Sequence, residues 1–120
     1  MADNHEFGRE GEERAREYLR TKGYQILECN WRFGNEEIDI IAKENKTLVI
    51  VEVKTRRNNY FGEPEMAVTR KKQKIIVRMA DAYINKKGLD LEVRFDIISI
   101  ILGGGNCSIN HIPDAFYPTL

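Results

Sequence analysis

Three carboxylates and one lysine lie close together on two adjacent predicted strands, at Glu37, Asp39, Glu52 and Lys54. Side chains alternate between the two faces of a strand, so these four charged groups are expected on one face of a hairpin. A shift of one residue in the strand pairing would separate them. The opposite face is predicted to be apolar and to consist of Ile38, Ile40, Val49, Val51 and Val53.

The hairpin that must hold these residues joins residues 36–42 to residues 47–55 through the polar loop Lys43–Lys46. A two- or four-residue turn within this loop predicts that opposed residues have numbers that sum to 89. Ile41 is then opposite Leu48, and Glu37 is opposite Glu52. The apolar side chains near the loop would desolvate the carboxylates on the same face and shift their pKa values.

Carboxylates paired in this way suit a divalent metal ion. Two carboxylates a few ångströms apart repel each other unless a cation lies between them, and hard oxygen ligands favour Mg²⁺ or Mn²⁺. Such an ion polarises a phosphoryl oxygen and lowers the pKa of a bound water, while a neighbouring lysine orients that water or stabilises developing charge. These residues therefore predict phosphodiester hydrolysis. The alternative is a solvent-facing hairpin in which Lys54 offsets the charge of Glu52.

The formal net charge is zero, but basic residues gather in the middle of the chain. Residues 1–53 carry eight Lys or Arg against twelve Asp or Glu, residues 54–78 carry eight against two, and residues 79–120 carry three against five. The middle segment, with Tyr60 and Phe61 interleaved, is typical of a surface that contacts a phosphate backbone. The alternative is a solvated basic helix face. Its cations are Lys54, Arg56, Arg57, Arg70, Lys71, Lys72, Lys74 and Arg78.

Seven elements are predicted to position these groups within one domain of 120 residues. Apolar residues at helical spacing predict helices over residues 7–22 and from about 68 to 88. Strands are predicted over residues 24–31, 36–42, 47–55, 91–102 and 107–112. The order αβββαββ predicts a central sheet covered by helices, of the α/β or α+β class.

Composition and segment patterns exclude several classes of protein. With 42% hydrophobic and 32% charged residues, the chain is expected to fold rather than remain disordered. The longest nearly apolar run, Ile97 to Leu102, is far shorter than the ~20 residues that span a bilayer. The N-terminal segment is acidic and mixed in charge, unlike a signal peptide, so a cytoplasmic protein is expected. Cys29 and Cys107 have no zinc-like spacing.

Several segments of the chain resemble known nuclease families. Asp39, twelve intervening residues and then Glu52-Val53-Lys54 resemble the PD-(D/E)XK motif of restriction-endonuclease-like nucleases. Six segments in the same order, over nearly the whole chain, resemble the YraN-like family of predicted endonucleases. These are Gly8-x-x-Gly11-Glu12, Asn30-Trp31-Arg32, Glu37-Ile38-Asp39-Ile40-Ile41-Ala42, Val51-Glu52-Val53-Lys54-Thr55-Arg56, Phe61-Gly62-x-Pro64 and Ala67-Val68 followed by Lys72.

The resemblance implies an α/β, restriction-endonuclease-like fold with a central mixed five-stranded sheet flanked by helices. Its catalytic residues would be Glu12, Asp39, Glu52 and Lys54. Asp39 and Glu52 would bind Mg²⁺ or Mn²⁺, and Lys54 would orient the attacking water. Glu12 would be a further acid supplied by the first helix, and the alternative for Glu12 is an exposed helical glutamate.

The resemblance extends to two basic residues, and the chain departs from the family pattern at one position. Arg56 and Lys72 match basic positions of the family and would contact phosphate; the alternative for each is ordinary surface charge. The family usually has glycine immediately before its Glu-Ile-Asp, where this chain has Glu36. Glu36 is expected to add negative charge near the metal and to alter the turn.

The sequence therefore predicts a metal-dependent endonuclease that acts on DNA, including branched or structured DNA. Similarity to archaeal Holliday-junction resolvases adds the expectation of a homodimer. The alternative is a non-catalytic nucleic-acid-binding module, but such a phosphate binder would gain nothing from three carboxylates beside its basic surface. Trp31 is expected in the core rather than as a base-stacking platform, and His111 is expected to be structural.

Overall fold

The computed structural model describes residues 4–57 and 68–118. Within these two ranges, two helices and five strands follow one another in the predicted order. The elements are α1 (Asn4–Thr21), β1 (Gln25–Phe33), β2 (Glu36–Glu44), β3 (Thr47–Arg57), α2 (Arg70–Lys87), β4 (Glu92–Gly103) and β5 (Asn106–Phe116). The sequence predictions made for Tyr60, Phe61, Gly62, Pro64 and Ala67 fall outside the described residues.

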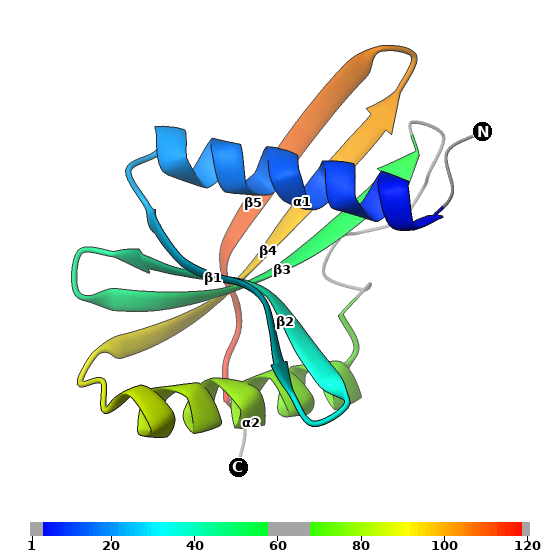
Figure 1. The fold of residues 1–120 in the computed structure, drawn as a ribbon. Helices are drawn as coiled ribbons and strands as arrows, with labels where there is room; N and C mark the ends of the chain where they lie inside the picture. Colours follow the sequence, from blue (N-terminus) through cyan, green and yellow to red (C-terminus); the bar gives the residue numbers. More distant parts are fainter. Residues whose placement is uncertain (1–3, 58–67, 119–120) are drawn as a thin grey trace.

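The five strands form one mixed sheet in the spatial order β1-β2-β3-β4-β5. Strands β3 and β4 are parallel, and the other neighbouring pairs are antiparallel. A parallel pair needs a crossover connection, and α2 lies in the connection between β3 and β4. Figure 1 shows a strongly twisted sheet with α1 on one face and α2 on the other. The predicted arrangement of a five-stranded sheet flanked by helices is confirmed.

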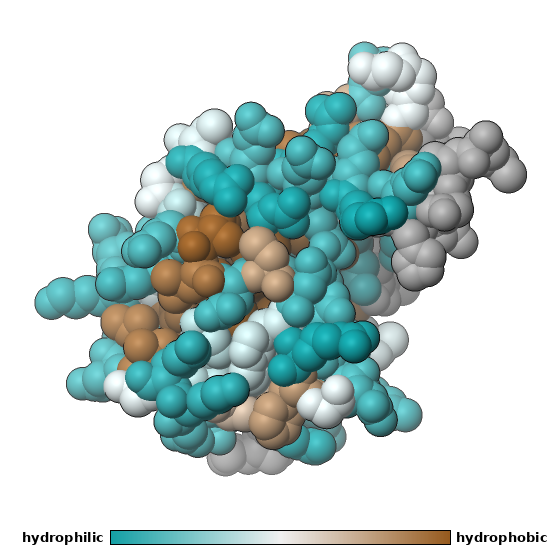
Figure 2. All heavy atoms as spheres, viewed as in Figure 1, coloured by the Kyte–Doolittle hydropathy of each residue, from teal (hydrophilic) through white to brown (hydrophobic). Residues whose placement is uncertain are grey.

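Each face of the sheet packs against one helix in its own apolar cluster. Ala15 and Leu19 of α1 pack on one face with Val49 and Val51, among others. Ile76, Met79 and Tyr83 are among the α2 residues that pack on the other face. Strand β3 contributes to both clusters, so its side chains are buried on either side. Figure 2 shows mostly hydrophilic residues on the side of α1 that faces away from the sheet. Neither described helix is long and apolar enough to cross a membrane.

Helix α2 begins at an N-cap that fixes its first turn. The side-chain oxygen of Thr69 accepts a hydrogen bond from the backbone N–H of Lys72 at 3.2 Å, which satisfies one of the free donors of the helix start. The helix therefore begins at Arg70, two residues after the predicted start. It ends at Gly88, whose φ of 63° is a left-handed conformation that glycine adopts without steric cost.

The β2–β3 hairpin has a register two residues away from the predicted one. Ile41 pairs with Ile50 and Glu44 pairs with Thr47, so opposed numbers sum to 91 (41 + 50). The prediction that Ile41 faces Leu48 was wrong. The turn consists of Asn45 and the residue after it, and Asn45 takes a φ of 55°, which asparagine tolerates better than most residues. A shift of two residues keeps side chains on their predicted faces, because a strand has a period of two.

Strand β5 is longer than the predicted strand 107–112 and continues through Pro113. It lies at an edge of the sheet, where a proline removes no hydrogen bond that the ladder needs. Asp114 then adopts a φ of 56°, and its backbone N–H donates to Asp96 Oδ1 at 2.9 Å. The last strand is thereby tied to a buried carboxylate of β4.

Helix α1 approaches β3 closely at Gly11, which is buried. A Cβ placed on Gly11 would overlap the side chain of Thr55, whose Cβ and Cγ2 would each be 2.9 Å away. Glycine therefore allows this approach because it has no side chain. The adjacent residue, Glu12, is brought to the same region of the sheet.

Gly11→Ala is expected to lower the free energy of unfolding by roughly 1–3 kcal/mol, because the added methyl group pushes α1 away from β3. Gly8→Ala on the same helix is the matched control, since a Cβ at Gly8 meets nothing within 4 Å. That control should be neutral or stabilising by up to about 1 kcal/mol. Urea denaturation of both variants measures the difference, and equal effects would contradict a tight contact at Gly11.

Candidate metal and nucleic-acid site

Strands β2 and β3 separate immediately beyond the Ile40–Val51 pair, where their ladder ends. Past this pair, the backbone N–H of Val53 donates to Asp39 Oδ2 at 2.8 Å. The carboxylate of Asp39 thus takes the place that a backbone carbonyl of the neighbouring strand would have in a regular ladder. This arrangement holds Asp39 between the two strands.

The alternation of side chains along β2 is interrupted at Asp39. Ile38 packs in the α2-side cluster together with Ile41, whereas Ile40 packs in the α1-side cluster. A regular strand would place Ile38 and Ile40 on one face, so that prediction was wrong for Ile38. On β1, Asn30 lies beside this point and takes a φ of 52°. A left-handed residue at such a position bends the strand and redirects its side chains.

Glu37 is consequently directed toward α1 and not toward Glu52. The side-chain amide of Asn30 donates to Glu37 Oε1 at 2.8 Å and to Glu12 Oε1 at 2.9 Å. Arg32 Nε lies 3.3 Å from Glu37 Oε2. The prediction that Glu37 and Glu52 share one face is therefore wrong. The break at Asp39 moves the side chains of the preceding residues of β2 to the face opposite to the predicted one. Glu12 lies within this polar chain, which links α1 to the β1–β2 hairpin.

Glu52 is a buried carboxylate with an unsatisfied oxygen. Its side chain is 2% exposed, and its Oε2 has no hydrogen-bond partner. Burial and the neighbouring charge of Asp39 raise the pKa of Glu52 to about 8, against the opposing effects of Lys72 and Lys54. A buried polar atom without a partner costs free energy and calls for an explanation such as a bound ion. Burial also shows that the solvent-facing interpretation of this hairpin is wrong for Glu52.

The carboxylate of Asp39 is the second one in the site whose pKa is raised. Burial raises its pKa to about 6; the charges of Glu12 and Glu37 add to this effect, while the N–H of Val53 and the charge of Lys54 oppose it. The charge of Asp39 in turn disfavours ionisation of Glu52. A cation between them would remove this repulsion.

The predicted basic residues come from two elements. Lys54 follows Glu52 by two positions on β3, and its charge lowers the pKa of both acids. Lys72 of α2 acts on Glu52 in the same direction. Arg56 of β3 is half-buried and donates from its guanidinium to the backbone carbonyl of the preceding residue at 3.2 Å. The structure therefore brings Lys54 and Lys72 to the acid pair and places Arg56 further along β3.

Glu36, which stands where the YraN-like pattern usually has glycine, begins β2. Its Oε2 lies 3.6 Å from Nζ of Lys72, so its charge is paired with the first turn of α2. Among the described non-glycine residues, a positive φ occurs at Asn30, Asn45 and Asp114. The backbone at Glu36 therefore does not require glycine, and the departure from the pattern leaves the turn intact.

The oxygen atoms of Asp39 and Glu52 fit a hard divalent cation. Mg²⁺ is commonly held by one or two carboxylates and keeps several waters to complete its octahedral shell. In residues 4–57 and 68–118, no group of three or more His, Cys, Asp or Glu residues is arranged to hold a metal ion. Water, backbone carbonyls or a substrate phosphate would have to complete the shell, which is the pattern of a Mg²⁺ or Mn²⁺ site rather than of a closed zinc site.

Comparison with known proteins decides the family. Residues 11–100 match the model described as "Uncharacterised protein family UPF0102". The chain belongs to the UPF0102 family. A UPF0102 protein of Phocaeicola vulgatus is 49% identical over 120 residues, which cover 100% of this chain and 99% of the relative. One of Bacteroides thetaiotaomicron is 51% identical over 120 residues, with the same coverage. One of Christiangramia forsetii is 48% identical over 117 residues, with 98% of each chain covered. The predicted YraN-like membership is confirmed.

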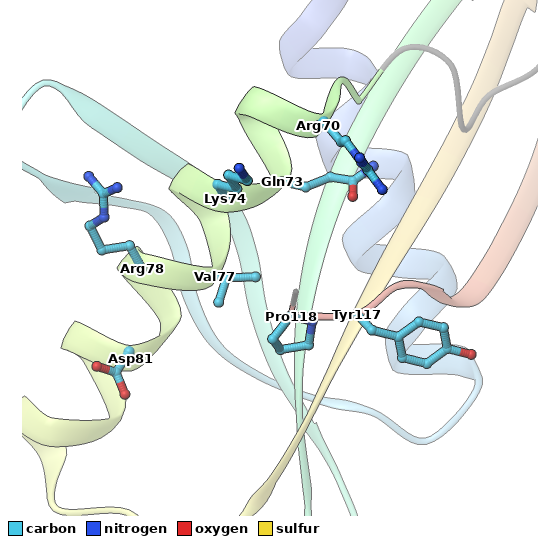
Figure 3. Close-up of a pocket in the computed structure, with 8 residues that line it drawn as sticks. All are labelled: Arg70, Gln73, Lys74, Val77, Arg78, Asp81, Tyr117 and Pro118. Carbon is cyan, nitrogen blue, oxygen red and sulfur yellow. The ribbon is translucent and has the colours of Figure 1, made fainter. Parts of the chain in front are cut away.

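The UPF0102 chain also has a basic cavity of about 620 Å³, between α2 and the segment that follows β5 (Figure 3). Arg70, Lys74 and Arg78 succeed one another at four-residue intervals along this side of α2, so their cations share one helix face. The predicted acids lie outside this cavity. The row of cations formed by Arg70, Lys74 and Arg78 suits a phosphate backbone. The described lining residues are Arg70, Gln73, Lys74, Val77, Arg78, Asp81, Tyr117 and Pro118.

A buried polar network beside α1 was missed by the sequence analysis. His111 Nε2 lies 2.7 Å from Asp96 Oδ2, and His111 Nδ1 lies 3.1 Å from the hydroxyl of Tyr18. Arg94 donates to both oxygens of Asp96 at 2.9 Å. Burial alone would raise the pKa of Asp96, but the hydrogen bonds from His111 and Arg94 hold it below its usual value. The network joins α1 to β4 and β5, which is the structural role expected of His111.

Proposed function

We propose that this UPF0102 protein is a metal-dependent endonuclease that hydrolyses phosphodiester bonds of DNA on a restriction-endonuclease-like fold. The observation that carries the proposal is the buried Oε2 of Glu52, which has no hydrogen-bond partner and belongs to an acid whose pKa is raised by burial and by the charge of Asp39. A purely structural carboxylate at this depth would be fully hydrogen-bonded, as Asp96 is in the same sheet.

The proposed roles follow from the positions of the side chains. Asp39 and Glu52 hold Mg²⁺ or Mn²⁺, which when bound supplies Lewis-acid polarisation of the phosphate and activation of water. Lys54, two residues from Glu52 on the same strand, orients the attacking water and stabilises the negative charge that develops on the phosphate. Glu12 adds negative charge beside Asp39 and is held in place through Asn30.

The proposed substrate is DNA that follows the basic surface to the acids. Lys72 and Arg56 contact its phosphates, and the row of cations along another face of α2 offers a second surface for phosphates. The resemblance to archaeal Holliday-junction resolvases extends the proposal to branched or structured DNA and to a homodimer. A phosphate binder without catalysis would bind better without the acid pair, which favours the enzyme over a binding module.

A cleavage panel tests the proposed activity. The purified protein is incubated with labelled linear duplex, nicked duplex, single-stranded and four-way-junction DNA, each with Mg²⁺, Mn²⁺ or EDTA. The proposal predicts strand cleavage of at least one substrate with either metal and none with EDTA. Binding of DNA without cleavage of any of the four substrates would instead identify a non-catalytic nucleic-acid-binding module.

Lys72→Ala and Arg56→Ala are each expected to weaken DNA binding to a similar extent for all sequences. Each should also reduce by about 1 the slope of log K against log salt concentration, because one phosphate contact is lost. Lys86→Ala, at the exposed far end of α2, is the control and should leave the slope unchanged. Fluorescence anisotropy over a range of salt concentrations measures the slope. If the slope of the Lys72 and Arg56 variants matches that of the wild type, both residues are ordinary surface charge.

A further inference from the structure

Phe33 is an exposed aromatic residue at the end of β1, where the chain turns into β2. Its side chain is 52% exposed, and it pairs across the hairpin with Glu36. Among the described residues, Phe33 and Tyr117 are the large hydrophobic residues that are exposed to this degree. Its neighbour Trp31 packs against the α2-side cluster, of which Phe33 is not a member.

The ring of Phe33 continues an aromatic series that begins in the core. Phe33 is stacked on Trp31 with ring centroids 5.9 Å apart and an interplanar angle of 15°. Trp31 in turn meets Tyr83 of α2 edge-on, with centroids 5.2 Å apart. Tyr83 is 3% exposed, and its hydroxyl is close to Glu28 Oε2 at 3.2 Å. One face of the Phe33 ring is thus supported by a fixed partner, and about half of the residue remains exposed to solvent, where a ligand can reach it.

Charged side chains near Phe33 link it to the acid pair and provide a cation for a polyanionic ligand. Glu36, opposite Phe33 in the hairpin, is paired with Lys72, and Lys72 lies near enough to Glu52 to lower its pKa. A flat apolar ring close to the Lys72 cation suits a nucleotide, whose base stacks while its phosphate meets the cation.

We infer that Phe33 is a stacking platform for an unpaired base of the nucleic acid that enters the site. A base inside a duplex has both faces covered by its neighbours, so the platform selects DNA with single-stranded or splayed bases next to the cleaved bond. The inference rests on the proposed function only in taking nucleic acid as the ligand. It deepens that proposal by naming the substrate class, which is DNA that carries unpaired bases.

Binding measured in EDTA tests the platform without cleavage. Wild type and Phe33→Ala are titrated with a single-stranded oligonucleotide and with the matched blunt duplex. The expected result is a loss of single-strand affinity of about 5- to 100-fold in Phe33→Ala and a change of less than about twofold for the duplex. Trp31 is the one tryptophan of the chain, and its fluorescence should change when the wild type binds the single strand but not when it binds the duplex.

Two further variants separate stacking from bulk hydrophobicity. Phe33→Tyr keeps an aromatic ring and should retain wild-type single-strand affinity, whereas Phe33→Leu keeps an apolar side chain and should behave like Phe33→Ala. Equal melting temperatures show that all variants are folded. Unchanged single-strand affinity in Phe33→Ala, or equal losses for strand and duplex, would overturn the inference while leaving the nuclease proposal standing. A wild type that binds no DNA would overturn both. A change in oligomeric state alone would identify Phe33 as a protein contact and would also overturn the platform.

Discussion

Glu52→Gln is expected to abolish metal-dependent cleavage, with a loss of at least about 100-fold, while DNA affinity is unchanged or improved. The amide keeps the shape of the side chain but provides a poor metal ligand and removes a negative charge that repels phosphate. Asp39→Asn should have the same effect, because the two carboxylates are proposed to hold one ion. Initial rates of cleavage with Mn²⁺ and dissociation constants in EDTA measure the two properties separately.

Glu92→Gln is the matched control, since Glu92 is an exposed acid at the start of β4 and should leave both properties unchanged. Lys54→Ala should differ from the acid variants by losing cleavage together with a modest loss of affinity, because a cation is removed. Cleavage by Glu52→Gln at the wild-type rate would rule out a metal centre at this position.

Without metal, the wild type is expected to lose stability as the pH rises from about 4 to about 8. Burial raises the pKa of Asp39 from 3.8 to about 6 and that of Glu52 from 4.5 to about 8. The folded state therefore binds more protons than the unfolded chain across this range, so the free energy of unfolding falls with increasing pH. Thermal melting in EDTA at a series of pH values measures the trend, and Glu52→Gln should flatten it between pH 6 and pH 8.

Added Mn²⁺ should reverse this loss, because the cation replaces the proton that the acid pair otherwise retains. The increase in melting temperature on metal addition is expected to grow from pH 6 to pH 8 and to reach on the order of 5 °C at saturating metal. The buffer counter-ions and ionic strength are held constant at each pH. A metal effect that is independent of pH, or that persists in the Asp39→Asn variant, would contradict binding at this pair.

The face of β3 that carries Glu52 could be predicted from the sequence because side-chain alternation is local and stays regular along this strand. The register could not, because the polar loop allows more than one tight turn. Asn45 was the available signal, since asparagine tolerates the positive φ that it adopts. The family resemblance supplied roles for Glu12 and Lys72, which lie on helices far from the hairpin in sequence.

Two features of the site depend on contacts that no local pattern encodes. The break in β2 at Asp39 coincides with the left-handed Asn30 on the neighbouring strand, and it redirects Glu37 toward α1. The network of His111 joins residues as far apart as Tyr18, 93 positions away. An isolated histidine in an apolar strand indicated a buried role but could not identify its partners.

The most direct test is a titration of the protein with Mn²⁺ in the presence of a non-hydrolysable DNA analogue at pH 8. Electron paramagnetic resonance measures how many Mn²⁺ ions the protein binds and with what affinity. We expect Mn²⁺ to bind to the wild type and to Glu92→Gln, and to bind at least tenfold more weakly to Glu52→Gln and to Asp39→Asn. Equal Mn²⁺ binding by the wild type and both acid variants would contradict this expectation, as would a wild type that binds DNA but no Mn²⁺.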